Sequence, residues 1–312
     1  MKPIKYILVT LVTIYFLAGI GDLFYSNSLK DKALFSGEVQ EWNRVNNGEI
    51  NVDLAVFGSS RAMIHINPQI LEDSLKIKTH NLGLNGSKFK MQYYRFLKYL
   101  DQNSHPKTTV WNLDTFSFSH IDEVFQPNQY VPFMLWNYKL YSYLKEYEDS
   151  DWKNYVIPFY RYKDQKYWQD EIKKSDKEKV DKNGDFRKKG FKSYNRNWNV
   201  NWATLKAKDA EFDIEVYPLL EELIKRCQKE NIQLIFTIAP EFYKGQDYML
   251  NRDEIVNRYK KTLKQYNLPL LDYSDDSISH QQKWFYNTTH LNDKGADEFT
   301  RRLAKDLKPL MK

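Results

Sequence analysis

A serine and a histidine far apart in the chain could together carry out acyl transfer. Ser60 lies in Gly58-Ser59-Ser60-Arg61, directly after the apolar run 52–57, and His290 lies in a polar loop near the C-terminus. A serine hydroxyl is a weak nucleophile until a base within hydrogen-bond reach takes its proton, and an imidazole with an unperturbed pKa of about 6.5 suits that role. We therefore predict that Ser60 and His290 form a catalytic pair. The alternative interpretation of the first motif is a turn whose serine only caps the following helix.

Alternating strands and helices must bring this pair together. Between the apolar runs, segments with apolar residues three or four positions apart are typical of amphipathic helices. The alternation predicts an α/β fold, namely a flavodoxin-like three-layer α/β/α sandwich with a five-stranded parallel sheet in the order 2-1-3-4-5. Ligands of such sheets bind beyond the carboxyl ends of the strands, and Ser60 follows the end of the first one. The runs predicted as strands are 52–57, 77–82, 108–113, 232–239 and 269–272.

The alternation breaks between about 117 and 212, where we predict a mainly helical insertion into a domain spanning 51–312. Glu171–Lys192 within it is rich in lysine and is predicted to be a solvated loop. Two interpretations stand for the insertion: a helical appendage with its own small core, or a cap over the sheet whose tryptophans line a groove that opens toward Ser60. The tryptophans concerned, five of the chain's eight, are Trp136, Trp152, Trp168, Trp198 and Trp202.

The N-terminal segment has the composition of a membrane anchor. Lys2 and Lys5 precede Tyr6–Gly21, which carries no charge, and residues 1–25 approach the ~20 residues that cross a bilayer. A cleaved signal peptide is the alternative, although no clear cleavage site follows. Because cytoplasmic flanks carry the lysines, we expect a single pass through a bacterial cell membrane, with the domain outside, in the periplasm or at the cell surface. Residues 26–50 are predicted to be a linker or a lead-in helix.

Composition narrows the class of partner. The 47 Lys and Arg residues exceed the 41 Asp and Glu residues by a margin that is spread along the chain, so we expect no nucleic-acid partner. Aromatic residues make up 16% of the chain, a high share that suits a surface facing carbohydrate. Cys227 is the only cysteine, which excludes an intramolecular disulfide. No His, Asp or Glu cluster has the spacing of metal ligands, so we expect neither a metal nor a cofactor.

Three short motifs resemble the SGNH (GDSL-type) hydrolase superfamily. Gly58-Ser59-Ser60-Arg61 resembles its first block, with serine in place of the usual aspartate before the nucleophile, and Asn81–Gly86 resembles its second. His290 matches the histidine of the fifth block. The resemblance covers about 50–116 and 213–310, and it implies that Ser60 and Gly86 donate backbone N–H groups to an oxyanion hole.

With the anchor, the chain is most similar to the envelope-associated branch of that superfamily, which includes the D-alanyl-transfer protein of teichoic acids and relatives of the alginate acetyltransferases. This resemblance implies a membrane-anchored acyl esterase or O-acyltransferase that acts on an acylated cell-envelope glycan or another ester. It also implies an acyl-transfer partner in the membrane. The acyl group, the glycan, and the choice between water and a sugar as acceptor stay open.

Two departures from the family pattern favour a second hypothesis. The third block, Gly-x-Asn, is replaced by Asn112-Leu113-Asp114, which leaves the side-chain oxyanion donor unplaced. Asn287 stands where the family has the aspartate that orients the histidine. Asparagine can hold the ring but cannot offset the charge of an imidazolium, so Asp272 or Asp114 is an alternative orienting residue. The rival hypotheses are a catalytically inactive domain that binds or helps to assemble a surface polysaccharide, and a plain lipid or small-ester hydrolase.

Overall fold

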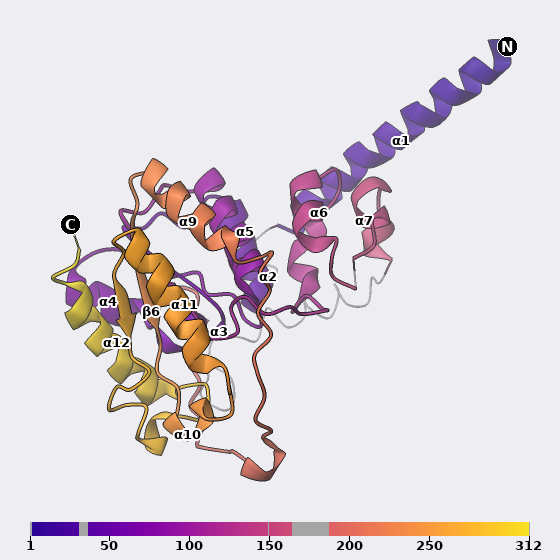
Figure 1. Ribbon diagram of the computed structural model, residues 1–312. Helices are drawn as coiled ribbons and strands as arrows, with labels where there is room; N and C mark the ends of the chain where they lie inside the picture. The colour runs from indigo at the N-terminus through magenta and orange to yellow at the C-terminus, as the bar shows by residue number, and fades with distance from the viewer. Residues whose placement is uncertain (1, 31–36, 149, 164–186, 312) are drawn as a thin grey trace. The chain divides into compact units, whose positions relative to one another are not determined.

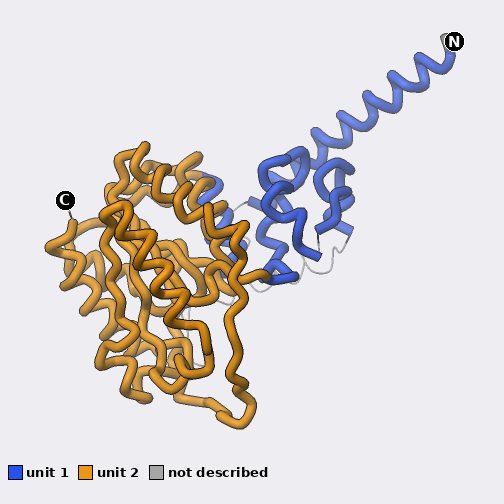
Figure 2. The backbone as a smooth tube through the Cα atoms, viewed as in Figure 1, with its two compact units in different colours: residues 1–47, 121–178 blue, residues 48–120, 179–312 orange. Residues whose placement is uncertain are grey.

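The computed structural model describes residues 2–30, 37–148, 150–163 and 187–311, which form two compact units (Figure 2). Unit 1 comprises Met1–Asn47 with Ile121–Glu178, and unit 2 comprises Gly48–His120 with Lys179–Lys312. This division differs from the predicted insertion at about 117–212, since the latter part of that segment belongs to unit 2. Trp168 and most of the predicted lysine-rich loop lie outside the described residues.

Unit 2 is built on a five-stranded, wholly parallel sheet in the order β2-β1-β3-β6-β7, which confirms the predicted order (Figure 1). The strands are short, and the central ones are buried on both faces, which explains their continuous apolar runs. Their bounds are β1 Leu54–Phe57, β2 Thr79–Asn81, β3 Thr108–Asn112, β6 Gln233–Ile238 and β7 Leu270–Asp272.

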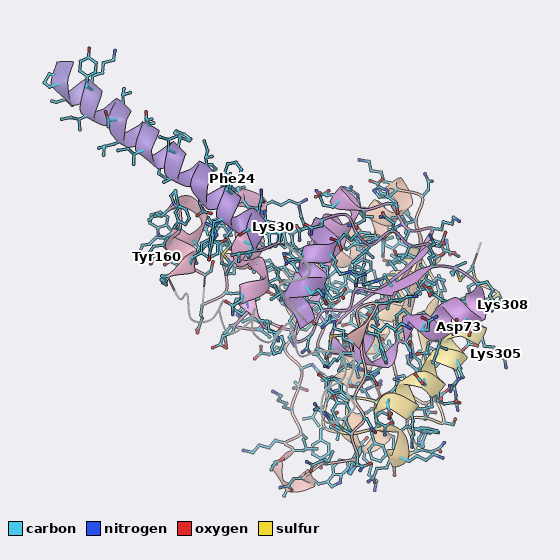
Figure 3. All side chains as sticks on the ribbon, turned by 180° about the vertical axis from the view of Figure 1, so that it is seen from behind. Phe24, Lys30, Asp73, Tyr160, Lys305 and Lys308 are labelled. Carbon is cyan, nitrogen blue, oxygen red and sulfur yellow. The ribbon has the colours of Figure 1, made fainter. Side chains whose placement is uncertain are left out.

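Helices cover both faces of this sheet and complete the predicted three layers. Side chains of β1, β3 and β6 at alternate positions, including Val56 and Val110, share one core with α4 and α12, which lie side by side (Figure 3). On the opposite face, Phe57 and Trp111 pack against Phe96 of α5, with ring centroids 5.3 and 5.8 Å away. The main helices are α4 Pro68–Leu75, α5 Phe89–Gln102, α9 Pro218–Lys229, α11 Arg252–Gln265 and α12 Asp293–Leu307.

Shorter elements connect these layers. They are α3 Ser60–His65, α10 Tyr243–Gln246, the 3₁₀ turns η3 Trp202–Thr204 and η4 Gln282–Trp284, and the antiparallel pair β4 Arg187–Lys188 and β5 Phe191–Lys192.

Unit 1 combines the N-terminal helix with a small aromatic head. Its elements are α1 Lys2–Ser28, α2 Gly37–Asn46, η1 Pro127–Phe133, α6 Tyr138–Leu144, α7 Lys153–Val156 and η2 Tyr160–Tyr162. Trp42 of α2 packs edge-on against Tyr130 of η1, 5.1 Å between centroids, so the segment predicted as a linker or a lead-in helix contains a packed helix. The segment Pro3–Ser28 is long and apolar enough to cross a membrane, and its side chains, Phe24 among them, are largely exposed (Figure 3).

Candidate active site

A glycine elbow places Ser60 at the carboxyl end of β1. Gly58 has φ +141°, and a Cβ there would lie 2.8 Å from the Cβ of Ala62 and 2.9 Å from the carbonyl of Asn112, so only glycine fits. Ser59 is the N-cap of α3: its Oγ accepts a hydrogen bond from the Arg61 N–H at 3.1 Å. Capping is therefore done by Ser59, which leaves the Ser60 hydroxyl available for chemistry.

The structure brings Ser60 and His290 together. Ser60 Oγ lies 3.0 Å from His290 Nε2 although 230 residues separate them in the chain. The Ser60 residue is 9% exposed, and His290 is half-buried. His290 belongs to the loop that the antiparallel bridge between Phe285 and Leu291 closes. The next residue, Asn292, is the N-cap of α12, and its side chain accepts from Gly295 N–H at 2.9 Å. A capped helix thus fixes one end of the histidine loop.

Asn287 orients the imidazole. Its Oδ1 accepts the backbone N–H groups of His290 at 2.7 Å and Thr289 at 3.0 Å, which identifies the oxygen, and it lies 3.2 Å from His290 Nδ1. An oxygen at this place favours the proton on Nδ1 and leaves Nε2 as the acceptor that faces Ser60. Asn287 therefore favours the tautomer with the proton on Nδ1, and it carries no negative charge.

Neither alternative carboxylate contacts His290, because each is paired with another residue. Asp272 hydrogen-bonds to Ser274 and pairs with Lys260 at 2.8 Å, and Asp114 pairs with Arg61. No carboxylate raises the pKa of His290. Desolvation, followed by the positive charge of Arg61, lowers this pKa to about 4. The imidazole is therefore neutral at pH 7, and its protonated form is disfavoured.

A buried charged cluster lies directly behind the elbow. The Arg61 guanidinium is fully buried, and its Nη1 lies 3.1 Å from Asp114 Oδ1 and 3.0 Å from Glu241 Oε1. Asp114 also accepts hydrogen bonds from Ser59 Oγ and, at 2.8 Å, from Asn112 Nδ2. Burial raises the pKa of Asp114, while Arg61 and Ser59 oppose that shift. The position that resembles the missing side-chain oxyanion donor is therefore occupied by a carboxylate in an ion pair.

His65, which the sequence analysis did not single out, supports the histidine loop. It is completely buried, its ring centroid lies 5.9 Å from that of His290, and its Nε2 accepts the Leu291 N–H at 3.1 Å. Accepting at Nε2 requires the neutral form, and desolvation followed by the Arg61 charge holds the pKa of His65 well below its usual value. The one feature of the sequence that could have indicated this role is that His65 follows Ser60 by five residues.

The loop after β2 is tied to the same elbow. Asn81, also missed, donates from Nδ2 to the carbonyls of Ala62 and Ile66, both at 2.7 Å, and so caps the end of α3. The Leu84 N–H donates to the Gly58 carbonyl at 2.8 Å. Gly86 follows in an exposed turn with φ +62°. Its predicted donation to an oxyanion remains a prediction.

Aromatic side chains flank the histidine. The Tyr286 ring is stacked on the His290 imidazole, with centroids 5.6 Å apart and planes 6° apart. Tyr194 lies 5.5 Å from Tyr286, and the Arg196 guanidinium lies 4.2 Å from the Tyr194 ring. One aromatic ring therefore adjoins His290, and a second ring and a cation lie beyond it.

The described tryptophans of the predicted insertion fall into two sets. Trp198 and Trp202 pack in unit 2 against Phe242, at 4.8 and 6.2 Å. Trp136 and Trp152 belong to unit 1, where they line a pocket of their own. Of the residues that the structure describes, no group of three or more His, Cys, Asp or Glu side chains could hold a metal ion.

Solved structures similar to the chain include esterases and a lipolytic protein. No protein-family model and no curated protein matches the chain. An acetyl xylan esterase, AlAXEase, is 13% identical with a TM-score of 0.40, covering 84% of this chain and all of that one. A member of the lipolytic protein G-D-S-L family from Veillonella parvula DSM 2008 is 9% identical, with a TM-score of 0.40 and coverages of 81% and 96%. The acetyl xylan esterase Est2A from Butyrivibrio proteoclasticus is 11% identical, with a TM-score of 0.37 and coverages of 82% and 63%. At these identities and TM-scores the likeness carries no argument about the activity of this chain.

Proposed function

We propose that the protein is a membrane-anchored serine esterase or O-acyltransferase that acts on an acylated cell-envelope glycan. The observation that carries the proposal is the 3.0 Å contact between Ser60 Oγ and His290 Nε2 at the carboxyl edge of a parallel sheet. A hydroxyl at this distance from the free lone pair of a neutral imidazole can lose its proton as it attacks a carbonyl.

The proposed reaction has two steps, acylation of Ser60 and transfer of the acyl group to an acceptor. Ser60 Oγ bonds to the acyl carbon of the substrate ester while its proton passes to His290 Nε2. The N–H groups of Ser60 and Gly86 stabilise the resulting oxyanion, each by about 3 kcal/mol if well aimed. The intermediate expels the sugar oxygen, which takes the proton from His290, and leaves Ser60 acylated. Water or a second sugar hydroxyl then gives its proton to His290 as its oxygen attacks the acyl carbon. The second intermediate expels Ser60 Oγ, which takes that proton back from His290, so that the acyl product leaves and the Ser60–His290 pair is restored.

The site is built for slow turnover. Each step passes through an imidazolium at His290, and the pKa of about 4 shows that its surroundings disfavour that cation. Asn287 keeps the ring in the useful tautomer, but it gives no compensating charge. We therefore expect turnover below that of enzymes with an aspartate at this position.

Two features support a glycan substrate at a membrane. Sugar rings stack on aromatic faces, and the Tyr286 ring lies beside His290 with the Tyr194 ring next to it. The helix α1 supports anchoring, and Lys2 and Lys5 before its apolar segment support an extracytoplasmic domain. Protease added to spheroplasts should digest the domain, and its protection would reverse this orientation.

Acyl release from acetylated oligosaccharides by the purified full chain tests the proposal. We expect Ser60→Ala and His290→Ala each to abolish most of the release, and the double variant to lose little more, because the two residues act as one unit. His280→Ala, an exposed histidine paired with Asp275, and Ser277→Ala serve as matched controls and should stay active. Equal release from Ser60→Ala and the unaltered chain would refute the mechanism.

A second candidate function is favoured by the same electrostatics. With Asn287 in place of a carboxylate and Arg61 lowering the pKa of the base, the domain could bind a surface polysaccharide without cleaving it. If His290→Ala still binds the oligosaccharide and the unaltered chain releases no acyl group, these results would favour the binding function over the enzyme.

A further inference from the structure

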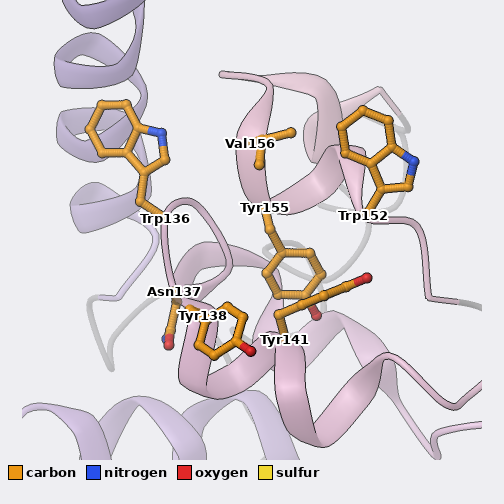
Figure 4. A pocket seen from close by; sticks show the side chains of 7 residues that line it. All are labelled: Trp136, Asn137, Tyr138, Tyr141, Trp152, Tyr155 and Val156. Carbon is orange, nitrogen blue, oxygen red and sulfur yellow. The ribbon is translucent and has the colours of Figure 1, made fainter.

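An apolar pocket opens in unit 1, which the catalytic proposal does not use. It has a volume of about 430 Å³, within the size range of small-ligand sites. None of the seven lining residues is charged, and the one amide, Asn137, already caps α6, where it accepts from Leu140 N–H at 3.0 Å. Figure 4 shows the lining side chains, with Trp136 on the side next to α1. They are Trp136, Asn137, Tyr138, Tyr141, Trp152, Tyr155 and Val156.

One wall of the pocket is joined to the N-terminal helix. The Trp136 ring lies so close to α1 that a Cβ added at Gly19 would be 2.2 Å from it, and its Nε1 donates to Tyr15 Oη at 3.0 Å. The same hydroxyl donates at 2.6 Å to the carbonyl of Val156, another lining residue. The pocket and α1 are therefore parts of one packed structure.

A buried ion pair fixes where the polar part of α1 begins. Asp22 and Arg161 are almost fully buried, with Arg161 Nη1 2.8 Å from Asp22 Oδ2 and Nη2 2.7 Å from Ser26 Oγ. The uncharged stretch Tyr6–Gly21 ends at this pair. Tyr15 lies about two helical turns, or about 10 Å, before Asp22, so the wall at Trp136 touches the segment that is apolar enough to lie in a membrane.

The surface around the pocket suits the boundary between lipid and water. Trp136 is 40% exposed, Trp152 is 56% exposed and Tyr138 is 80% exposed, all on the head that α1 carries. Tryptophan and tyrosine are enriched at this boundary because their rings are apolar and one edge is polar. Burying this apolar surface in a bilayer would stabilise the head at the membrane.

We propose that this pocket binds one acyl chain of a phospholipid from the leaflet on which unit 1 lies. The proposal rests on the anchoring role of α1. A flexible chain can enter a cavity of this volume and bury methylene groups against the rings, and uncharged walls admit no headgroup. A helix of a partner protein would instead need a surface of small residues, and the pocket is lined by large aromatic ones.

Photolabelling of the full chain in vesicles of phosphatidylethanolamine and phosphatidylglycerol tests the proposal. A trace of phosphatidylglycerol would carry a diazirine midway along one acyl chain, and mass spectrometry would locate the label. We expect label on the peptides that contain Trp136, Tyr141 and Tyr155.

Two neighbouring residues give a matched pair of variants. Val156 lines the pocket and is 39% exposed, whereas Ile157 is 40% exposed and does not line it. Val156→Phe should fill the mouth and reduce labelling of the pocket about tenfold, equivalent to about 1.4 kcal/mol. Ile157→Phe should label like the unaltered chain. Trp152→Ser, which removes one wall, should also reduce labelling and serves if Val156→Phe does not fold.

The outcomes test the lipid-binding pocket and the membrane anchor independently. Equal labelling of all variants, or label on α1 with none on the pocket peptides, would overturn the pocket while the anchor stands. Crosslinks from the pocket to another protein in native membranes, without lipid label, would overturn it in favour of a protein partner. Recovery of the full chain in the soluble fraction would instead refute the anchor in the proposed function.

Discussion

Replacing Asn287 by aspartate should convert the orienting amide into a charge partner for His290. The side-chain oxygen already accepts two backbone N–H groups at 2.7 and 3.0 Å, so a carboxylate keeps these bonds and the loop geometry. In a serine protease the reverse change costs about 10⁴ in turnover, because it produces the wrong tautomer. Here the tautomer is already right, so the gain reports the charge alone.

The size of the gain follows from the distance. Asn287 Oδ1 lies 3.2 Å from His290 Nδ1, and unit charges about 4 Å apart attract by about 4 kcal/mol at an effective dielectric constant of about 20. Desolvation of the new carboxylate offsets part of this, and an opposite charge so near typically shifts a pKa by about 1–3 units. The pKa of His290 should therefore rise from about 4 to roughly 5–7. If about half of that stabilisation is expressed in the transition state, turnover rises roughly 3- to 30-fold.

The pH dependence of kcat/KM measures both effects. Protonated imidazole cannot act as a base, so the acid limb of the profile reports the pKa of His290 in the free protein. In Asn287→Asp this limb should move to higher pH while the plateau rises. Gln282→Glu adds the same charge on an exposed residue nearby and should change neither. An unmoved limb with an unchanged plateau in Asn287→Asp would show that His290 is not the base.

Three further changes test the support of the site. Gly58→Ala should lower the melting temperature and abolish activity, because φ +141° and contacts below 3 Å exclude a side chain; an unchanged melting temperature would contradict the elbow geometry. Arg61→Met leaves Asp114 and Glu241 buried without their cation and should cost about 3–5 kcal/mol of unfolding free energy, measured with urea. Because the pKa of His65 is lowered on folding, the neutral form is favoured, and stability that is full above about pH 6.5 should fall as the pH drops below it. His65→Gln should flatten that fall between pH 7 and 5, and an equally steep fall would assign it to other groups.

The sheet could be predicted from the sequence because it depends on local signals. Apolar runs bounded by polar turns identify buried strands, and the helices between them require parallel pairing, which together determine the order β2-β1-β3-β6-β7. Ser60 follows the end of β1 and His290 lies just before the last helix, so the order of the strands predicts that the two residues are close. The distance between their side chains could be obtained only from the structure.

The electrostatics of the site could not be predicted in this way. The sequence offered Asp114 and Asp272 as partners of the imidazole, and only tertiary packing shows that Arg61 and Lys260 pair with them instead. His65 was missed because a histidine in a short helix gives no sign that its ring accepts the N–H group of Leu291, 226 residues away. Contacts of this kind depend on side-chain directions that periodicity does not encode.

The most direct test of the central claim is whether Ser60 becomes covalently modified. A fluorophosphonate reacts with an activated serine, and intact-protein mass spectrometry of the full chain followed by peptide mapping locates the adduct. We predict one adduct on Ser60 in the unaltered chain, none in Ser60→Ala, and much slower formation in His290→Ala, since the 3.0 Å contact supplies the base. An unaltered chain that stays unmodified while folded, or an adduct that forms equally in Ser60→Ala, would contradict the account.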